Sequence, residues 1–374
     1  MKYFLSIGFC LLVFLTVSCS RDSSPGTEEE EEVILPNFRL IGEDEANIYQ
    51  YTYNANAEGG TEINLTQTLG VDPFYLTLRQ VAEVVSFYSF SADNFSLIQQ
   101  NTLTGQSASY PNFYTVSDER SITWGTNSED LVFLGYYSPK GSRNFGLRTL
   151  DPTDGSFTDI SLDFNIQQAY DPLYYRQRLF ITYKDEAGNY KIVVYNTETR
   201  SIMLTLNYGP GIPNLLIDEL GNVGILVGLG DSDFVYYVLD LETLNEINEF
   251  TFSLNEFLPP GPLQGDIFDT TLYYTNYLAQ PSEIPFGPAY FDFVTNENFV
   301  VDILGIVQQV ELETQFTVAL TALRYYNEAE VFLMGYADAS SQTDLRGGVL
   351  IISKSGQLLS RIELPFVPTF FVKP

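Results

Sequence analysis

The sequence predicts an all-β fold built from one short unit that recurs along the chain. From about residue 35 onward, runs rich in Val, Ile, Tyr, Phe and Thr alternate with Gly, Asn, Asp and Pro, the pattern of strands and turns. No stretch combines a 3.6-residue apolar period with helix caps, so we expect no helix in the body. With 45% hydrophobic residues, the chain of 374 residues can bury a large core.

The recurring unit is a hairpin in which a strand, a short polar turn and a second strand follow one another. Copies recur roughly every 45 to 60 residues, close to the period of a propeller blade. Their first strands are predicted at 48–53, 95–100, 145–150, 190–195, 234–239, 290–294 and 349–352. We therefore expect a β-propeller over residues 36–374, with seven four-stranded blades. Six or eight blades are the alternatives, because hairpin counting can miss or add one.

This repeat resembles the YVTN/WD40-like propeller architecture in the turn motif Asn/Asp-x-x-Thr/Gly, as in Asn101 to Thr104 and Asp240 to Thr243. The Gly-His and Trp-Asp marks of WD40 repeats are absent, so the resemblance implies an architecture and no specific family. The fifth unit shows four strands most clearly, at 214–218, 223–228, 234–239 and 246–252.

The two ends of the body are complementary. The first unit offers only three strands, at 38–41, 48–53 and 61–65, and lacks an innermost one. A spare strand at 369–372 follows the last rim strand at 358–364. Joining the two ends removes two free sheet edges, which otherwise invite aggregation. We expect the C-terminal strand to complete the first blade and close the ring.

Charge and composition exclude several functions. The chain has 18 Lys and Arg against 48 Asp and Glu, a net charge of −30, and no histidine. Histidine-dependent triads and histidine-ligated metals are therefore excluded. Nucleic acid is not an expected partner, because neutralising phosphates takes clustered cations. The charge disfavours acidic polysaccharides and favours neutral glycans or basic partners.

The N-terminus predicts export. Lys2 is the only charge before Arg21, and the apolar run 4–17 is too short to span a bilayer permanently. The ending Leu15-Thr16-Val17-Ser18-Cys19 resembles the lipobox of bacterial lipoproteins, although that family usually has Leu where Thr16 stands. The resemblance implies a signal peptide over residues 1–18 and lipidation of Cys19. The alternative is an ordinary signal peptide cleaved near Ser18.

Residues 19–35 form an acidic tether with five consecutive glutamates at 28–32, which repel one another and stay extended. An acidic stretch directly after a lipidated cysteine resembles the surface-export signal of Bacteroidota lipoproteins. This implies a lipid-anchored protein of the outer membrane at the cell surface, with the periplasmic face as the alternative. The body is expected to be monomeric.

Function is expected on one face of the ring. Loops between blades and loops between a blade's second and third strands emerge on the same face, and four of them are long. They cover 253–265, 278–288, 304–316 and 337–347. The candidate contact residues on these loops are Phe257, Tyr277, Glu283, Phe286, Asp338, Asp344 and Arg346.

We therefore expect a non-catalytic binding or scaffold module that holds a partner protein or a neutral glycan at this face. The alternative is an envelope glycan-active enzyme, a hydrolase or lyase, using carboxylates or tyrosines at the channel mouth. No catalytic residue, resident metal or cofactor is assigned. Calcium at Asp231 and Asp233 is a weaker alternative, because EF-hand spacing is absent.

Replacing Cys19 with Ala should release the protein from membranes, because the lipid has no other attachment point in the predicted mature chain. Membrane fractionation followed by immunoblotting checks this. Cys10→Ala, inside the predicted signal peptide, is the matched control and should leave the protein membrane-bound. Retention of the Cys19→Ala protein in the membrane fraction would contradict the lipid anchor.

Overall fold

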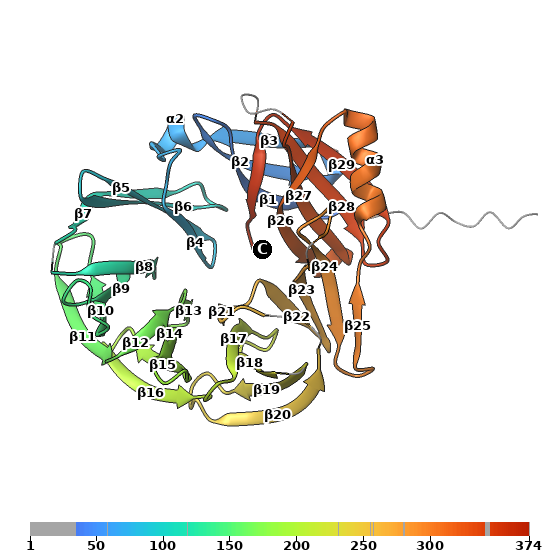
Figure 1. The fold of residues 1–374 in the computed structure, drawn as a ribbon. Coiled ribbons are helices and arrows are strands. Elements are labelled where there is room, and N and C mark those ends of the chain that lie inside the picture. The colour runs from blue at the N-terminus through green and yellow to red at the C-terminus, as the bar shows by residue number, and fades with distance from the viewer. Residues whose placement is uncertain are drawn as a thin grey trace, which may run out of the picture. The chain divides into compact units, whose positions relative to one another are not determined.

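The computed structural model describes residues 35–373, apart from residues 58, 118, 231, 255, 257, 280 and 341–344. The predicted signal peptide, Cys19 and nearly all of the tether lie outside the described residues. Leu35–Pro374 form one compact unit. In it, seven separate sheets stand side by side around a common axis, so this unit is a ring (Figure 1). The expectation of a seven-bladed β-propeller is confirmed.

In each blade the strands follow one another from the axis to the rim. From the innermost strand outward, blade 1 has β30 (Val367–Phe371), β1 (Phe38–Glu43), β2 (Ile48–Asn54) and β3 (Gly59–Asn64). Blade 2 has β4 (Thr77–Val81), β5 (Val84–Ser91), β6 (Asn94–Asn101) and β7 (Ser107–Thr115). Blade 3 has β8 (Ser121–Asn127), β9 (Val132–Tyr137), β10 (Phe145–Leu150) and β11 (Phe157–Asp163).

Blades 4 and 5 each carry an irregular inner strand. Blade 4 has β12 (Ile166–Ala169) and β13 (Leu173–Tyr175), which both pair with β14 (Arg178–Asp185), then β15 (Tyr190–Asn196) and β16 (Ser201–Asn207). Blade 5 has β21 (Gly261–Pro262), β17 (Ile212–Ile217), β18 (Val223–Gly230), β19 (Asp233–Leu239) and β20 (Glu246–Ser253).

The last two blades are regular. Blade 6 has β22 (Gly265–Phe268), β23 (Thr271–Tyr277), β24 (Phe286–Asp292) and β25 (Glu297–Val300), and blade 7 has β26 (Val318–Tyr326), β27 (Val331–Asp338), β28 (Gly347–Ser353) and β29 (Leu358–Leu364).

The first blade joins the two ends of the described chain, as expected. β30 pairs antiparallel with β1, with Leu40 opposite Phe371. Both residues are buried, and the Phe371 ring lies edge-on to Phe38 with 6.2 Å between ring centroids. β1 is therefore paired on both sides, with β2 and with β30, and β30 becomes the innermost strand of the blade.

The polar residue that opens each outer hairpin holds its turn. The Asn101 side chain accepts hydrogen bonds from the backbone N–H groups of Leu103 and Thr104. Asn196 and Asp240 bind the N–H of Thr199 and Thr243 in the same way. Such Asx turns imitate a backbone turn at little conformational cost, which is why the motif recurs.

The core is divided among the seven gaps between neighbouring blades. Trp124 and Phe145 of blade 3, for example, pack with Leu179 of blade 4. Successive residues of a strand point to opposite faces. Tyr273 therefore packs toward blade 7, while its neighbour Tyr274 packs toward blade 5. Each blade is held by apolar contacts on both of its faces.

One expectation about the loops is wrong. Residues 304–316 were expected to be a loop, but Leu304–Thr314 form α3, which buries Ile306, Val307 and Val310. Ile303 stands at its N-cap and makes no side-chain cap, so the usual start signal is missing. The other helical segments are α2 (Leu65–Leu69), η1 (Ala55–Ala57) and η2 (Asn327–Ala329). Neither α-helix of the described residues is long and apolar enough to cross a membrane.

Truncating Phe371 to Ala should lower the free energy of unfolding by about 3–5 kcal/mol, the usual cost of removing a buried phenylalanine. Urea denaturation followed by circular dichroism measures it. The matched control is Phe74→Ala, whose ring is 81% exposed and should change the stability by less than about 0.5 kcal/mol. Equal effects of the two substitutions would contradict a closure held by β30.

Candidate functional site

The long loops share one face of the ring, as the alternation of antiparallel strands requires. Residues 253–265 join blade 5 to blade 6, and 304–316 join blade 6 to blade 7. The other two, 278–288 and 337–347, link the second and third strands of blades 6 and 7. We call this side the loop-rich face.

One of these loops turns inward toward the axis. Its residues Gly261–Pro262 form β21, which pairs parallel with β17 as an additional innermost strand. The Leu263 N–H donates to the Leu215 carbonyl at 2.7 Å, and the Asn214 amide donates to the Pro259 carbonyl. Gly261 has φ +103°, and a Cβ there would lie 3.2 Å from the Asp171 carbonyl oxygen. Glycine lets this segment approach Tyr170 and Asp171 of the neighbouring blade 4 closely.

Blade 4 makes room for that approach because its innermost strand is interrupted. β12 and β13 both pair with β14, and Asp171 and Pro172 between them leave the ladder, while the Tyr170 N–H still donates to the Thr182 carbonyl at 3.0 Å. Pro172 has no N–H to donate, so it favours the break. The break places Tyr170 and Asp171 at the channel wall, facing the inward loop.

A pocket of about 360 Å³ lies between this break and the inward loop. We call it the mouth pocket; its lining is Ala169, Tyr170, Asp171, Leu258, Pro259, Pro260, Pro262, Leu263, Gln264, Thr275 and Tyr277. Tyr277 is 52% exposed, and its hydroxyl donates to Gln264 Oε1 at 3.4 Å. Burial, reinforced by a hydrogen bond with Tyr190, raises the pKa of Tyr170 well above its usual value.

A second cavity, of about 450 Å³, lies on the axis and shares Asp171, Pro262, Leu263, Gln264 and Thr275 with the mouth pocket. We call it the channel cavity; its lining includes 78–81, 171–174, 262–266, 273–275, 321–325, 369–371 and Lys373. The two cavities are therefore adjacent, and the channel cavity is built from inner strands of blades that are distant in sequence.

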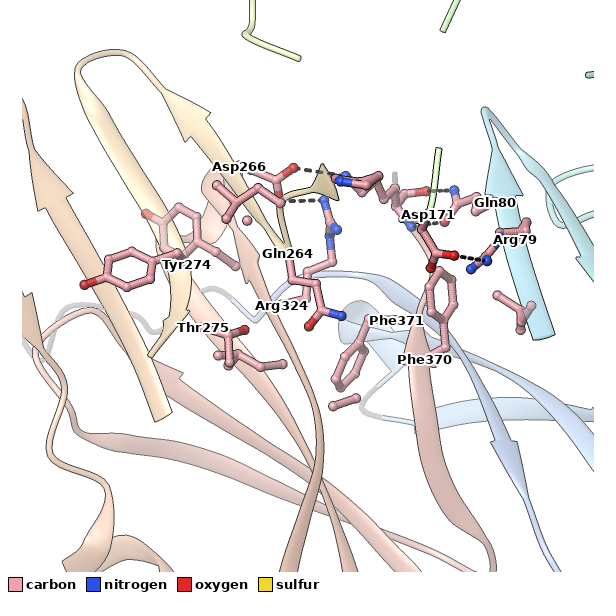
Figure 2. Close-up of a pocket in the computed structure, with 18 of the residues that line it drawn as sticks. Arg79, Gln80, Asp171, Gln264, Asp266, Tyr274, Thr275, Arg324, Phe370 and Phe371 are labelled. Carbon is pink, nitrogen blue, oxygen red and sulfur yellow. Dashed lines mark hydrogen bonds and ion pairs between the residues drawn. The ribbon is translucent and has the colours of Figure 1, made fainter. Parts of the chain in front are cut away.

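Ion pairs cross the channel cavity (Figure 2). On one side Arg79 donates from Nη2 to Asp171 Oδ1 at 2.8 Å and from Nε to the Gly125 carbonyl at 3.2 Å. On the other side Asp266 accepts from Arg324 at 2.7 Å and from Lys373 Nζ at 3.3 Å. Both carboxylates that line the cavity are therefore neutralised by cations.

The position of Lys373 is fixed through its backbone. Its N–H donates to Gln80 Oε1 at 2.8 Å, and its carbonyl accepts from Gln80 Nε2 at 3.1 Å. Its side chain is 53% exposed within the channel. Desolvation among the surrounding strands lowers the pKa of Lys373, and the nearby Arg324 lowers it further, while Asp266 opposes both.

Among the predicted contact residues that the structure describes, Tyr277 alone lines either cavity. Phe286 lies next to Tyr277, with 6.3 Å between ring centroids, and also packs into the core between blades 6 and 7. Glu283 is exposed and accepts a hydrogen bond from Gln308 of α3. Phe257 and Asp344 lie outside the described residues.

Asp338 and Arg346 form a separate cluster on the loop-rich face. The Asp338 side chain is 1% exposed, accepts from the Ser340 backbone and hydroxyl, and pairs with Arg346 at 3.6 Å. Arg346 lies over the Phe316 ring, 4.6 Å from its centroid. The burial of Asp338 indicates that it holds the end of β27 in place, so it offers a ligand no open carboxylate.

Sequence reasoning missed the residues of the channel cavity. Arg79 and Arg324 lie in the middle of inner strands, where a charge among apolar residues is the one available signal. Their partners Asp171 and Asp266 are 92 and 58 residues away. Within the described residues, no three Asp, Glu or Cys side chains gather as a metal-ligand set.

Comparisons with known proteins bear on the fold. No protein-family model and no curated protein matches the chain. A solved structure of a Lactobacillus plantarum protein is similar with a TM-score of 0.50 and 12% identity, over 90% of this chain and 100% of that one. The structure of TolB from Acinetobacter baumannii is similar with a TM-score of 0.42 and 12% identity, over 89% of this chain and 80% of that one. The structure of a prolyl endopeptidase is similar with a TM-score of 0.48 and 10% identity. This match covers 78% of this chain but only 43% of that one.

Asp338→Asn should destabilise the protein at neutral pH by about 1–3 kcal/mol, the usual worth of hydrogen bonds to a charged group. The pKa of Asp338 is lowered in the folded state despite burial, by bonds from Ser340 and the charge of Arg346. Because this pKa is lower in the folded state than in the unfolded state, the charged carboxylate of Asp338 stabilises the fold above about pH 4. This stabilisation is lost as the pH falls through the pKa of the folded state. The stability gap between wild type and variant should therefore narrow below about pH 4.

Urea denaturation of the two proteins between neutral and acidic pH measures this gap. Asp130→Asn, at an exposed turn, is the control and should show a small gap at every pH. A gap for Asp338→Asn that stays constant on acidification would contradict the role of its charge.

Proposed function

We propose that the chain is an outer-membrane lipoprotein, anchored at Cys19, whose propeller binds a neutral glycan without catalysis at the mouth pocket. The observation that carries the proposal is the combination of an exposed tyrosine and side-chain amide and hydroxyl groups in one pocket on the loop-rich face. Tyr277, Gln264 and Thr275 supply these groups. The acidic tether would hold the ring away from the membrane, at the cell surface or, alternatively, the periplasmic face.

The chemistry of the mouth pocket suits a sugar. A volume of about 360 Å³ falls in the usual range of small-ligand sites. An exposed tyrosine ring offers an apolar face to the C–H groups of a pyranose. The Gln264 amide and the Thr275 hydroxyl can donate to and accept from sugar hydroxyls. The net charge of −30 favours an uncharged chain over a polyanionic one at this surface.

Two observations support binding rather than turnover. The carboxylates of Asp171 and Asp266 are each paired with arginine, whereas a general base needs an available lone pair near its substrate. Burial raises the pKa values of Tyr170 and Tyr274 well above the ordinary tyrosine value. These phenols are therefore protonated at neutral pH and can donate hydrogen bonds, but they are poor bases and nucleophiles.

A glycan hydrolase or lyase is the second candidate, because Asp171 and Asp266 line the same cavity with two arginines. Product analysis after incubation with a bound glycan separates the candidates. Intact glycan supports the binding module, whereas cleavage that Asp171→Asn abolishes supports the enzyme. The third candidate is binding of a partner protein at the loop-rich face. A pull-down from envelope extracts tests it.

Tyr277→Ala should weaken binding of a neutral glycan about three- to tenfold, the worth of one aromatic stacking contact. A neutral-glycan array selects the ligand, and isothermal titration calorimetry measures its affinity. Phe74→Ala is the control, an exposed aromatic in the loop between blades 1 and 2 that lines neither cavity. An array without any bound neutral glycan, or equal affinities of the two variants, would contradict the proposed site.

A further inference from the structure

The channel cavity differs in charge from the rest of the protein. Its five charged lining residues are three cations, Arg79, Arg324 and Lys373, and two anions, Asp171 and Asp266. The whole chain has 18 cations against 48 anions. At physiological ionic strength charges are screened beyond about 8 Å, so the local surplus of one positive charge decides what the cavity attracts.

We propose that the channel cavity binds a small organic molecule through a carboxylate, held by Arg324 and Lys373. This site lies beyond the neutral-glycan site proposed above and does not depend on it.

The surplus positive charge lies beside Asp266, where Arg324 and Lys373 meet. Asp266 is shared, because its Oδ2 accepts from Arg324 and its Oδ1 from Lys373. Arg79 and Asp171 form their own pair elsewhere in the cavity. The two cations Arg324 and Lys373 therefore share the single carboxylate of Asp266, and a ligand carboxylate beside them would balance the charge.

The cations also have unused donors. Arg324 Nε is buried and has no hydrogen-bond partner among the described residues. An ammonium has three protons to donate, and the half-exposed side chain of Lys373 leaves room for another acceptor. Desolvation and the nearby charge of Arg324 both lower the pKa of Lys373. A ligand anion would supply the missing stabilisation.

The geometry favours a single carboxylate over other anions. A planar carboxylate matches the donor fork of a guanidinium in two parallel bonds. One surplus positive charge balances a monoanion but not a doubly charged phosphate. The volume of about 450 Å³ admits a molecule of sugar-acid size, and Phe370, Phe371 and Leu323 supply an apolar wall for its carbon skeleton. Long polyanions remain disfavoured by the acidic surface.

Isothermal titration calorimetry of the purified protein tests the site with three carboxylates of different shape, D-glucuronate, lactate and benzoate. D-glucose and inorganic phosphate are the comparison probes. We expect saturable binding of at least one carboxylate that is tighter than that of glucose or phosphate. Lys373→Gln and Arg324→Gln should each weaken it about tenfold or more, the worth of a charged hydrogen bond.

Arg143→Gln is the matched control, because it removes one positive charge from an exposed ion pair with Glu186 outside the cavity. It should bind the carboxylate like wild type. Lys373→Gln keeps the test valid if Arg324→Gln fails to fold, since the Lys373 side chain is half exposed. No binding of any of the three carboxylates, tighter binding of phosphate, or equal affinities of Lys373→Gln and Arg143→Gln would overturn the proposal. Loss of glycan binding at the mouth pocket would leave this result unaffected.

Discussion

The antiparallel pairing of β30 with β1 is the interaction on which the rest of the molecule depends. It supplies the missing inner strand of the first blade and leaves β1 paired on both sides. It also brings Lys373 to the axis, where Gln80 of blade 2 binds its backbone. The channel cavity exists only in the closed ring, because Asp266, Arg324 and Lys373 come from three different blades.

Closure is stable because each blade packs on both of its faces. The alternation along a strand sends Tyr273 and Tyr274 into two different gaps between blades. This accounts for the repeated aromatic pairs without any role in binding. The proposed glycan site uses an aromatic residue that this packing leaves open, because Tyr277 is the most exposed aromatic of its strand.

The sequence predicted what depends on local pattern. The hairpin turns could be predicted because the side chains of Asn101 and Asp240 accept hydrogen bonds within their own turns. Ring closure could be predicted from the spare strand at the end of the chain. Helix α3 was missed because it lacks a side-chain N-cap. The ion pairs were missed because their partners, such as Arg79 and Asp171, are 92 residues apart and only the ring geometry joins them. Of the predicted contact residues, Tyr277 reached a cavity and Asp338 was buried.

The first blade contains strands from both ends of the body, so it can be completed only late in synthesis. Thr369 and Ile41, which are joined by a hydrogen bond, lie 328 residues apart, so nearly all of the body must be synthesised before the ring can close. Contacts of such sequence separation form slowly, because the entropy of closing the loop has to be overcome first. If the chain, proposed above to be exported, crosses the membrane during synthesis, the ring and its channel would therefore form only after the last strand has crossed.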